Sequence, residues 1–137
     1  MSSILSLETD YMEGLSLKEM KLQNFYEVKI RHGKKVIAHT SCNFSNGEIQ
    51  VRDLYVCKEF RGKGFGELLL ARVLDYATEQ NAVRIVSYCG PEPFCEDGQI
   101  PLDQEIAWYK DHGFVHDHDV MGVTPCMVKE LHQEAAL

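Results

Sequence analysis

Apolar and polar side chains alternate in the first half of the chain, as they do in half-buried β-strands. The segment 25–31 places its charged residues on one side and three apolar residues on the other: Tyr26, Val28 and Ile30. A second extended run covers 36–44, and Asn46-Gly47 predicts a tight hairpin into a third strand, because this dipeptide tolerates positive φ angles. We therefore predict an antiparallel meander over 25–56.

The third strand of this meander contains an irregularity. Ile49 and Val51 follow one alternating phase, whereas Leu54 and Val56 follow the other. A β-bulge near Arg52 or Asp53 would produce such a slip of one residue. The bulge would bend the strand away from its neighbour and leave backbone groups beyond it for a ligand to pair with.

The residues before the meander carry weaker signals. Ser3–Leu7 fits a short strand, and Glu13–Leu22 shows a weak helical pattern with three apolar residues to bury: Leu15, Met20 and Leu22. We expect a helix over 13–22.

After Gly66 the apolar period changes to about 3.6 residues, which is typical of an amphipathic helix. The stripe comprises Leu69, Leu70, Val73, Leu74 and Ala77. Val83–Tyr88 follows as a strand with apolar residues in both phases. A strand, a helix and a strand in succession predict a right-handed crossover between parallel neighbours.

The remaining pattern completes a mixed sheet. Residues 89–102 are rich in Pro, Gly and Cys and predict a long loop, Asp103 is placed to cap a short helix through His112, and Gly113 to end it. A strand begins at Phe114, and the last extended run is Pro125–Leu131. The fold class is α/β (α+β), with a mixed, mostly antiparallel central sheet and one βαβ unit. A length of 137 residues predicts a single domain, 1–137, with one site.

A glycine-rich loop, Arg61-Gly62-Lys63-Gly64-Phe65-Gly66, joins the third strand of the meander to the strong helix. Glycines let backbone N–H groups approach an anion, and the helix N-terminus adds partial positive charge. Arg61 and Lys63 add full positive charges. The spacing matches neither the Rossmann fingerprint nor the Walker A motif. The loop therefore predicts a phosphate cradle of another kind.

These residues together resemble the GNAT superfamily of N-acetyltransferases. The family's apolar triplet, Arg-Gly-x-Gly-x-Gly loop and Leu-rich helix correspond to Leu54-Tyr55-Val56, Arg61–Gly66 and 67–70. The resemblance covers 48–90 and extends to 107–114, where a helix carries Tyr109 four residues before Gly113-Phe114, and to the final strand at 127–131. It implies a GNAT-like acyl-CoA N-acyltransferase fold, although the first 24 residues are short for the family's usual pair of helices.

The resemblance also implies a ligand and its contacts. The donor is acetyl-CoA, with its pyrophosphate on the glycine loop and its pantetheine along the bulged strand. The implied cofactor-binding residues are Leu54, Tyr55, Val56, Arg61, Gly62, Lys63, Gly64, Phe65 and Gly66. Tyr109 is the implied acid near the cofactor sulfur, and a phenol, with an ordinary pKa of about 10, is protonated at neutral pH.

The general base is not settled by the sequence. Many relatives carry a glutamate on the bulged strand eleven residues before the loop arginine, where this chain has Gln50. Glu48 is the favoured catalytic substitute; Asp53 lies on the opposite strand face unless the bulge reorients it. A water chain or a backbone carbonyl stays open as well. The family's asparagine seven residues before the helix tyrosine is replaced by Leu102.

Composition narrows the range of ligands. Fourteen Lys and Arg against 21 Asp and Glu give a net charge of −7, which argues against a nucleic-acid partner. No apolar run is long enough to span a membrane and no secretory leader is recognisable, so we expect a cytoplasmic protein without a membrane partner. The five cysteines are scattered, and we expect no disulfide. The alternating His and Asp at 116–119 favour a solvated strand, so no metal is assigned.

The leading interpretation is an N-acetyltransferase that moves an acetyl group from acetyl-CoA to a primary amine of a small molecule or protein by direct attack. Two alternatives keep the same fold: a sensor that binds acyl-CoA without turnover, motivated by Gln50 and Leu102, and a protein-interaction module that uses the loop at 89–102. The identity of the amine and association into a homodimer stay open.

Overall fold

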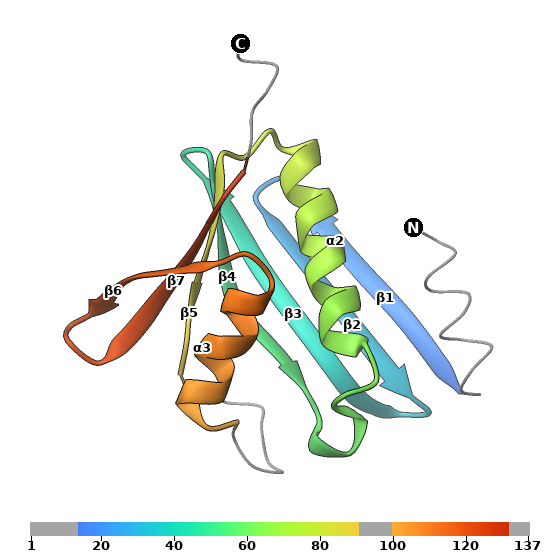
Figure 1. Ribbon diagram of the computed structural model, residues 1–137. Coiled ribbons are helices and arrows are strands. Elements are labelled where there is room, and N and C mark those ends of the chain that lie inside the picture. Colours follow the sequence, from blue (N-terminus) through green and yellow to red (C-terminus); the bar gives the residue numbers. More distant parts are fainter. Residues whose placement is uncertain (1–13, 91–99, 132–137) are drawn as a thin grey trace.

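The computed structural model describes residues 14–90 and 100–131, which form a seven-stranded sheet with two α-helices (Figure 1). The strands run in the order β1-β2-β3-β4-β5-β7-β6. Their bounds are β1 Leu15–Leu22, β2 Phe25–His32, β3 Lys35–Ser45, β4 Glu48–Val56, β5 Arg84–Tyr88, β6 Val115–Val120 and β7 Thr124–Glu130. The helices are α2 Phe65–Glu79 and α3 Leu102–Asp111, and a short 3-10 turn, η1 Lys58–Phe60, precedes the glycine loop.

The sheet is antiparallel except at one place. β1 through β4 form an antiparallel meander, β4 pairs with β5 in parallel, and β5, β7 and β6 pair antiparallel again. The parallel pair is joined by α2, which is the predicted crossover. The predicted mixed, mostly antiparallel sheet with one βαβ unit is confirmed.

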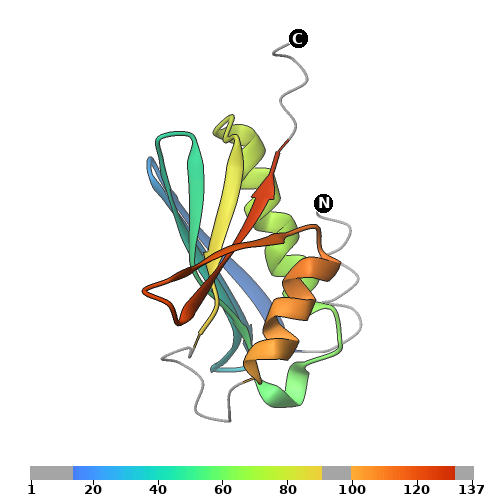
Figure 2. The ribbon, with the colours of Figure 1, turned by 60° about the vertical axis from the view of Figure 1, so that its left-hand side comes forward.

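Both helices cover the same face of the sheet, as the two views show together (Figures 1 and 2). The core lies between this face and α2, where the apolar sides of the strands meet the helix stripe. Tyr26 of β2 stacks on Tyr76 of α2 with ring centroids 4.9 Å apart. The fully buried centre also includes Val28, Ile37, Ile49, Leu69, Val73 and Ile85. We call this covered side the helix face and the other side the open face.

The expected helix over 13–22 is wrong in the described part of that range, because Leu15–Leu22 forms strand β1. β1 pairs residue by residue with β2, from Leu15 opposite His32 to Leu22 opposite Phe25. The backbone ladder outweighs a weak side-chain periodicity. The strand expected at Ser3–Leu7 lies outside the described residues.

The second half of the chain follows the expectation closely. α2 runs from Phe65 to Glu79, and α3 ends near Gly113, whose φ of +92° is the left-handed conformation that glycine adopts readily. Asp103 does not cap α3: the helix begins one residue earlier, Pro101 occupies the N-cap position, and no side chain caps it. Asp103 instead lies in the first turn of α3, where its negative charge interacts favourably with the positive end of the helix dipole.

Four cysteines lie in the described residues, and all four are buried with free thiols: Cys42, Cys57, Cys89 and Cys126. Burial raises the pKa of Cys42 to about 12, so this thiol stays protonated at neutral pH. None of the described helices is long and apolar enough to cross a membrane.

Candidate active site

The glycine loop leads into α2 with backbone donors exposed. Gly62 and Gly64 have φ angles of +76° and +92°, and Gly64 is the N-cap of α2 without any side-chain cap. The hydrogen bond of the first turn runs from the Leu68 N–H to the Gly64 carbonyl. The helix therefore leaves the N–H groups before Leu68 without intrahelical partners, at its positive end. Such an arrangement binds anions.

The loop is tied to the end of β4 by Arg61. Its Nε donates to the Val56 carbonyl at 2.8 Å, so the loop folds back against the strand. Lys63 is exposed and does not line the neighbouring pocket. Of the two basic residues predicted to contact a ligand, the structure brings Arg61 to the pocket and leaves Lys63 on the surface.

The β-bulge lies where the phase slip predicts. Along β3, Ser41 faces Asp53 while the next residue, Cys42, faces Val51, so Arg52 is the extra residue of β4. Beyond this point β4 pairs with β3 alone, because its pairing with β5 ends at Val51. We call residues 48–51 the paired half of β4 and residues 54–56 the open half. The open half presents a strand edge toward β5, as predicted.

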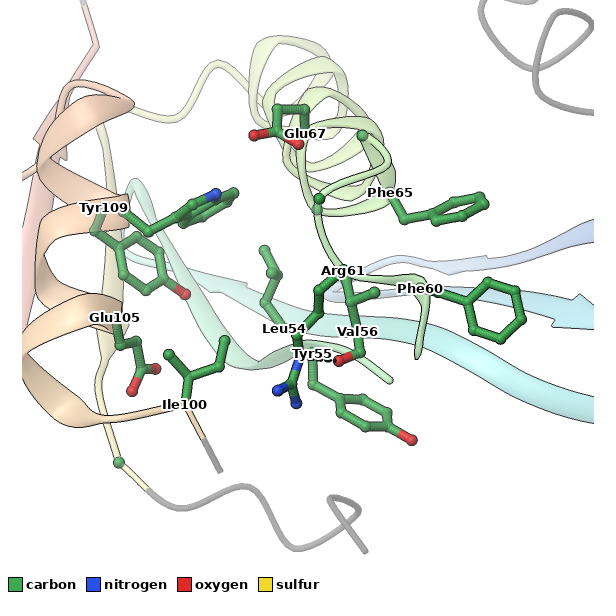
Figure 3. Close-up of a pocket in the computed structure, with 15 residues that line it drawn as sticks. Leu54, Tyr55, Val56, Phe60, Arg61, Phe65, Glu67, Ile100, Glu105 and Tyr109 are labelled. Atoms are coloured by element: carbon green, nitrogen blue, oxygen red, sulfur yellow. Dashed lines mark hydrogen bonds between the residues drawn. The ribbon is translucent and has the colours of Figure 1, made fainter. Parts of the chain in front are cut away.

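A pocket of about 300 Å³ lies between the open half of β4, the glycine loop and α3 (Figure 3). Eight of the nine predicted cofactor-binding residues line it, all except Lys63. The complete lining is Leu54, Tyr55, Val56, Phe60, Arg61, Gly62, Gly64, Phe65, Gly66, Glu67, Gly90, Ile100, Glu105, Trp108 and Tyr109. Residues distant in sequence therefore meet in one cavity, which is mostly apolar with a few polar groups, as ligand pockets are.

The two helices approach each other closely at Gly66. A Cβ built on Gly66 would lie 3.2 Å from Cζ2 of Trp108, which is tighter than ordinary contact. The absence of a side chain at this position lets α3 lie against the start of α2. Gly66 thus closes one wall of the pocket, in addition to the loop role expected for it.

Tyr109 is the predicted acid, and it lies at the pocket wall with 3% of its surface exposed. Ser87 Oγ of β5 donates to the Tyr109 hydroxyl oxygen at 2.8 Å. The ring packs edge-on against Trp108 and Phe114, with centroids 5.2 and 5.1 Å away. The hydroxyl is thereby fixed at the pocket, where a proton donor would be needed.

Glu105 is a pocket residue that sequence reasoning did not select. It lies on α3 one turn before Tyr109, and burial raises the pKa of its carboxyl group to about 7, although a hydrogen bond from the Gly90 backbone N–H lowers it in part. The spacing of four residues on a predicted helix was the available signal, because residues at i and i+4 share one helix face.

Glu48 is the predicted base, and the structure does not bring it to the pocket. It begins the paired half of β4, six residues before Leu54, which is roughly 20 Å along a strand. Its carboxylate accepts from Gln50 Nε2 at 3.1 Å and lies 3.8 Å from a guanidinium nitrogen of Arg84. The placement of Glu48 on the same strand face as Gln50 is as expected, but both side chains lie on the open face of the sheet.

Asp53 is reoriented by the bulge. It faces Ser41 in the ladder and so shares the open face with Gln50. Its carboxylate is already engaged, because it accepts from Ser41 Oγ at 2.8 Å and lies 2.6 Å from His39 Nδ1. Glu27 lies 2.9 Å from the other ring nitrogen of His39. Burial alone would lower the pKa of His39, but the hydrogen bonds to Asp53 and Glu27 outweigh it, and the pKa is raised.

The His-Asp run at 116–119 lies on β6, whose side chains there are exposed. His116 pairs with Asp119 and His118 with Asp117, each at 2.7 Å. Across the part of the chain that the structure describes, no group of three or more His, Cys, Asp or Glu side chains is placed to hold a metal ion.

Comparison with known proteins now assigns the family. The model of the acetyltransferase (GNAT) family matches residues 6–114, and the chain belongs to this family. No curated protein matches the chain. The resemblance read from the glycine loop and its flanks is confirmed.

Solved structures agree on the fold. The chain is similar to the PaiA N-acetyltransferase of Thermoplasma acidophilum, solved with coenzyme A, at a TM-score of 0.64 and 15% identity over 79% of this chain and 62% of that one. It is also similar to a GNAT family acetyltransferase of Elizabethkingia anophelis, solved with acetyl-CoA. The TM-score is 0.63 and the sequence identity 10%, over 87% of this chain and 99% of that one. For an acetyltransferase of Thermus thermophilus, the TM-score is 0.61 and the sequence identity 15%, over 95% of this chain and 71% of that one. The chain thus spans less than two thirds of the first of these relatives.

Proposed function

We propose that this protein transfers an acetyl group from acetyl-CoA to a primary amine of a small molecule or protein by direct attack. The observation that carries the proposal is the pocket itself. It joins an open strand edge, the backbone donors of a glycine loop and a fixed tyrosine hydroxyl in one cavity. Membership of the acetyltransferase (GNAT) family and the coenzyme A ligands of two structural relatives support it.

The residues present fit coenzyme A. Gly62 and Gly64 keep side chains away from the N–H groups at the start of α2, which suits a pyrophosphate. The open half of β4 offers backbone groups to which amides of a pantetheine chain can pair, in the manner of an added strand. Apolar side chains, among them Leu54, Phe65 and Trp108, line the space between these regions.

Bound acetyl-CoA would supply an activated acyl group, because a thioester is readily attacked by a neutral amine. The chain's own residues then have three tasks. A backbone N–H of the open half of β4, near Tyr55 or Val56, would donate to the carbonyl oxygen as charge develops on it. Tyr109 would deliver a proton to the departing sulfur, and the Ser87 hydrogen bond would stabilise the phenolate that remains. The apolar lining would limit competing hydrolysis by water.

The decisive experiment is a turnover screen. The protein is incubated with acetyl-CoA and, in separate reactions, polyamines, aminoglycosides, amino acids, N-terminal peptides and lysine peptides. Thiol release is followed, and the amine product is identified by mass spectrometry. We expect amine-dependent thiol release with at least one class, above the rate without amine. Acetyl-CoA binding without turnover on any amine would favour a sensor, and the absence of binding would leave an interaction module.

A further inference from the structure

Glu105 is a carboxyl group inside a pocket that is otherwise largely apolar. It projects from α3 into the pocket together with Tyr109, and their Cβ atoms are about 5–6 Å apart, since residues four apart are neighbours on a helix face. Figure 3 shows both side chains on the same wall of the pocket, facing Leu54 of the open half of β4. Glu105 therefore lies one helical turn from the tyrosine that the proposed function uses, on the same wall of the pocket.

The carboxyl group is held in place from a second element. The backbone N–H of Gly90, just beyond the end of β5, donates to it, and Gly90 also lines the pocket. The raised pKa of about 7 follows from burial and leaves protonated and ionised forms both present at neutral pH. A general base works best when its pKa is close to the operating pH.

The other carboxylates are less suited. Glu67 also lines the pocket, but its side chain is 55% exposed and lies 3.2 Å from His112 Nε2. Glu48 and Asp53 lie on the open face and are engaged by Arg84 and by His39. Among the described residues that line the pocket, Glu105 is thus the carboxylate that faces the interior. The hydrogen bond that affects its pKa comes from a backbone N–H group, that of Gly90.

We propose that Glu105 is the general base that accepts the proton of the attacking amine. The proposal rests on the proposed function. As the nitrogen bonds to the acetyl carbon, Glu105 takes the N–H proton. As the carbon–sulfur bond breaks, Tyr109 gives its hydroxyl proton to the sulfur, which leaves with the bonding electron pair. Tyr109 regains a proton from Glu105 through solvent, so the net transfer is one proton from amine to thiol. One helix then carries both the acid and the base.

The test compares Glu105→Gln with Glu79→Gln as a matched control, because Glu79 is also a helical glutamate but lies outside the pocket and pairs with Lys21 at the surface. Each variant is assayed from pH 5.5 to 9 on an amine found in the turnover screen. For the parent protein, kcat/KM should rise with pH through about 7, the pKa to which burial raises the Glu105 carboxyl group. Glu105→Gln should lose this rise and fall roughly 10²–10⁴-fold in turnover at pH 8. Glu79→Gln should keep both the rise and most of the turnover.

A second readout does not depend on turnover. Because folding raises the pKa of Glu105, the folded state binds its proton more tightly than the unfolded state does. The stability that this tighter proton binding provides is fully present below the pKa of the unfolded state, about 4.5. It is lost as the pH rises through the pKa of the folded state, about 7. The melting temperature of Glu105→Gln relative to the parent should therefore increase from pH 5 to pH 8.

The outcomes separate the two proposals. If the parent protein acetylates no amine, the proposed function and the base role fall together. If the parent is active and Glu105→Gln keeps its turnover and its rise near pH 7, the base role alone is overturned. A melting-temperature difference that stays constant from pH 5 to pH 8 also overturns it, because Glu105 would then not titrate in that range.

Discussion

The two halves of β4 belong to one strand but have different neighbours. The paired half, residues 48–51, is bonded to β3 on one side and to β5 on the other, and its apolar residues Ile49 and Val51 are buried in the core. The open half, residues 54–56, is bonded to β3 alone and lines the pocket. Between them lie Arg52, the extra residue of the bulge, and Asp53. The site therefore lies where the pairing of β4 with β5 ends.

The difference also explains which acidic residue is placed for chemistry. Glu48 belongs to the paired half, where neighbouring strands and Arg84 engage it on the open face. Glu105 comes from α3, whose side chains line the pocket opposite the open half of β4. A carboxylate on β4 is therefore not required for the proposed reaction, and three substitutions test this account, in order of decreasing expected effect.

The largest effect is expected for Tyr109→Phe. The ring keeps its packing against Trp108 and Phe114, while the hydroxyl and its Ser87 hydrogen bond are lost. Turnover should fall roughly 10²–10⁴-fold, the range for a lost general acid, with acetyl-CoA affinity nearly unchanged. Loss of one buried hydrogen bond should cost only about 1 kcal/mol of stability. Turnover and the melting temperature are measured on the same preparation. Full turnover in a stably folded variant would refute the acid role of Tyr109.

The next largest effect is expected for Gly64→Val, which tests the glycine loop that follows the open half of β4. Valine at a φ of +92° would distort the N-cap of α2 and the donors around it. Losing two hydrogen bonds to a charged phosphate, at about 1.5 kcal/mol or more each, should raise the Kd for acetyl-CoA about 100-fold or more in calorimetry.

Gly33→Val is the matched control for this substitution. Gly33 also has a positive φ, +63°, but it lies in the turn between β2 and β3 and has nothing within 4 Å of an added Cβ. It should carry similar backbone strain without weakening acetyl-CoA binding. Equal Kd values for Gly64→Val and the parent would show that the loop is not the phosphate cradle.

The smallest effect is expected for Glu48→Gln, in the paired half. The change removes an ion pair with Arg84 at 3.8 Å between partly exposed groups, which is worth about 0–1 kcal/mol. Turnover should stay within about twofold of the parent, as measured by thiol release at pH 8. A tenfold loss without a change in melting temperature would return Glu48 to the catalytic machinery and break the distinction between the two halves.

Much of the fold follows from local patterns in the sequence. Alternation predicts β2, the 3.6-residue period predicts α2, and the slip between Val51 and Leu54 predicts the bulge, because each pattern reports burial on one side of an element. β1 was missed for a physical reason. On the helix face, Leu15 and Leu17 are followed by Glu19 and Lys21, which pair with Arg72 and Glu79 of α2. The apolar alternation therefore stops halfway along the strand.

The candidate site could be predicted where one segment supplies it and, through the family resemblance, at Tyr109 of α3. The glycine loop and the open half of β4 are adjacent in sequence, and eight of the nine residues expected there line the pocket. Glu105 is singled out by its burial in the pocket and by a hydrogen bond from Gly90, which is distant in sequence, and no local pattern reveals either. The same holds for the pairing of His39 with Asp53 and Glu27, which unites three strands.

The most direct test of the central claim is a map of amide chemical shifts in the parent protein as acetyl-CoA is added. The account predicts saturable changes at the open half of β4, residues 54–56, and at residues 62–67 of the loop and the start of α2. Amides of the paired half, residues 48–51, should change little, because both neighbouring strands already pair with them. Saturable changes centred on the paired half, or none in the loop, would contradict the account.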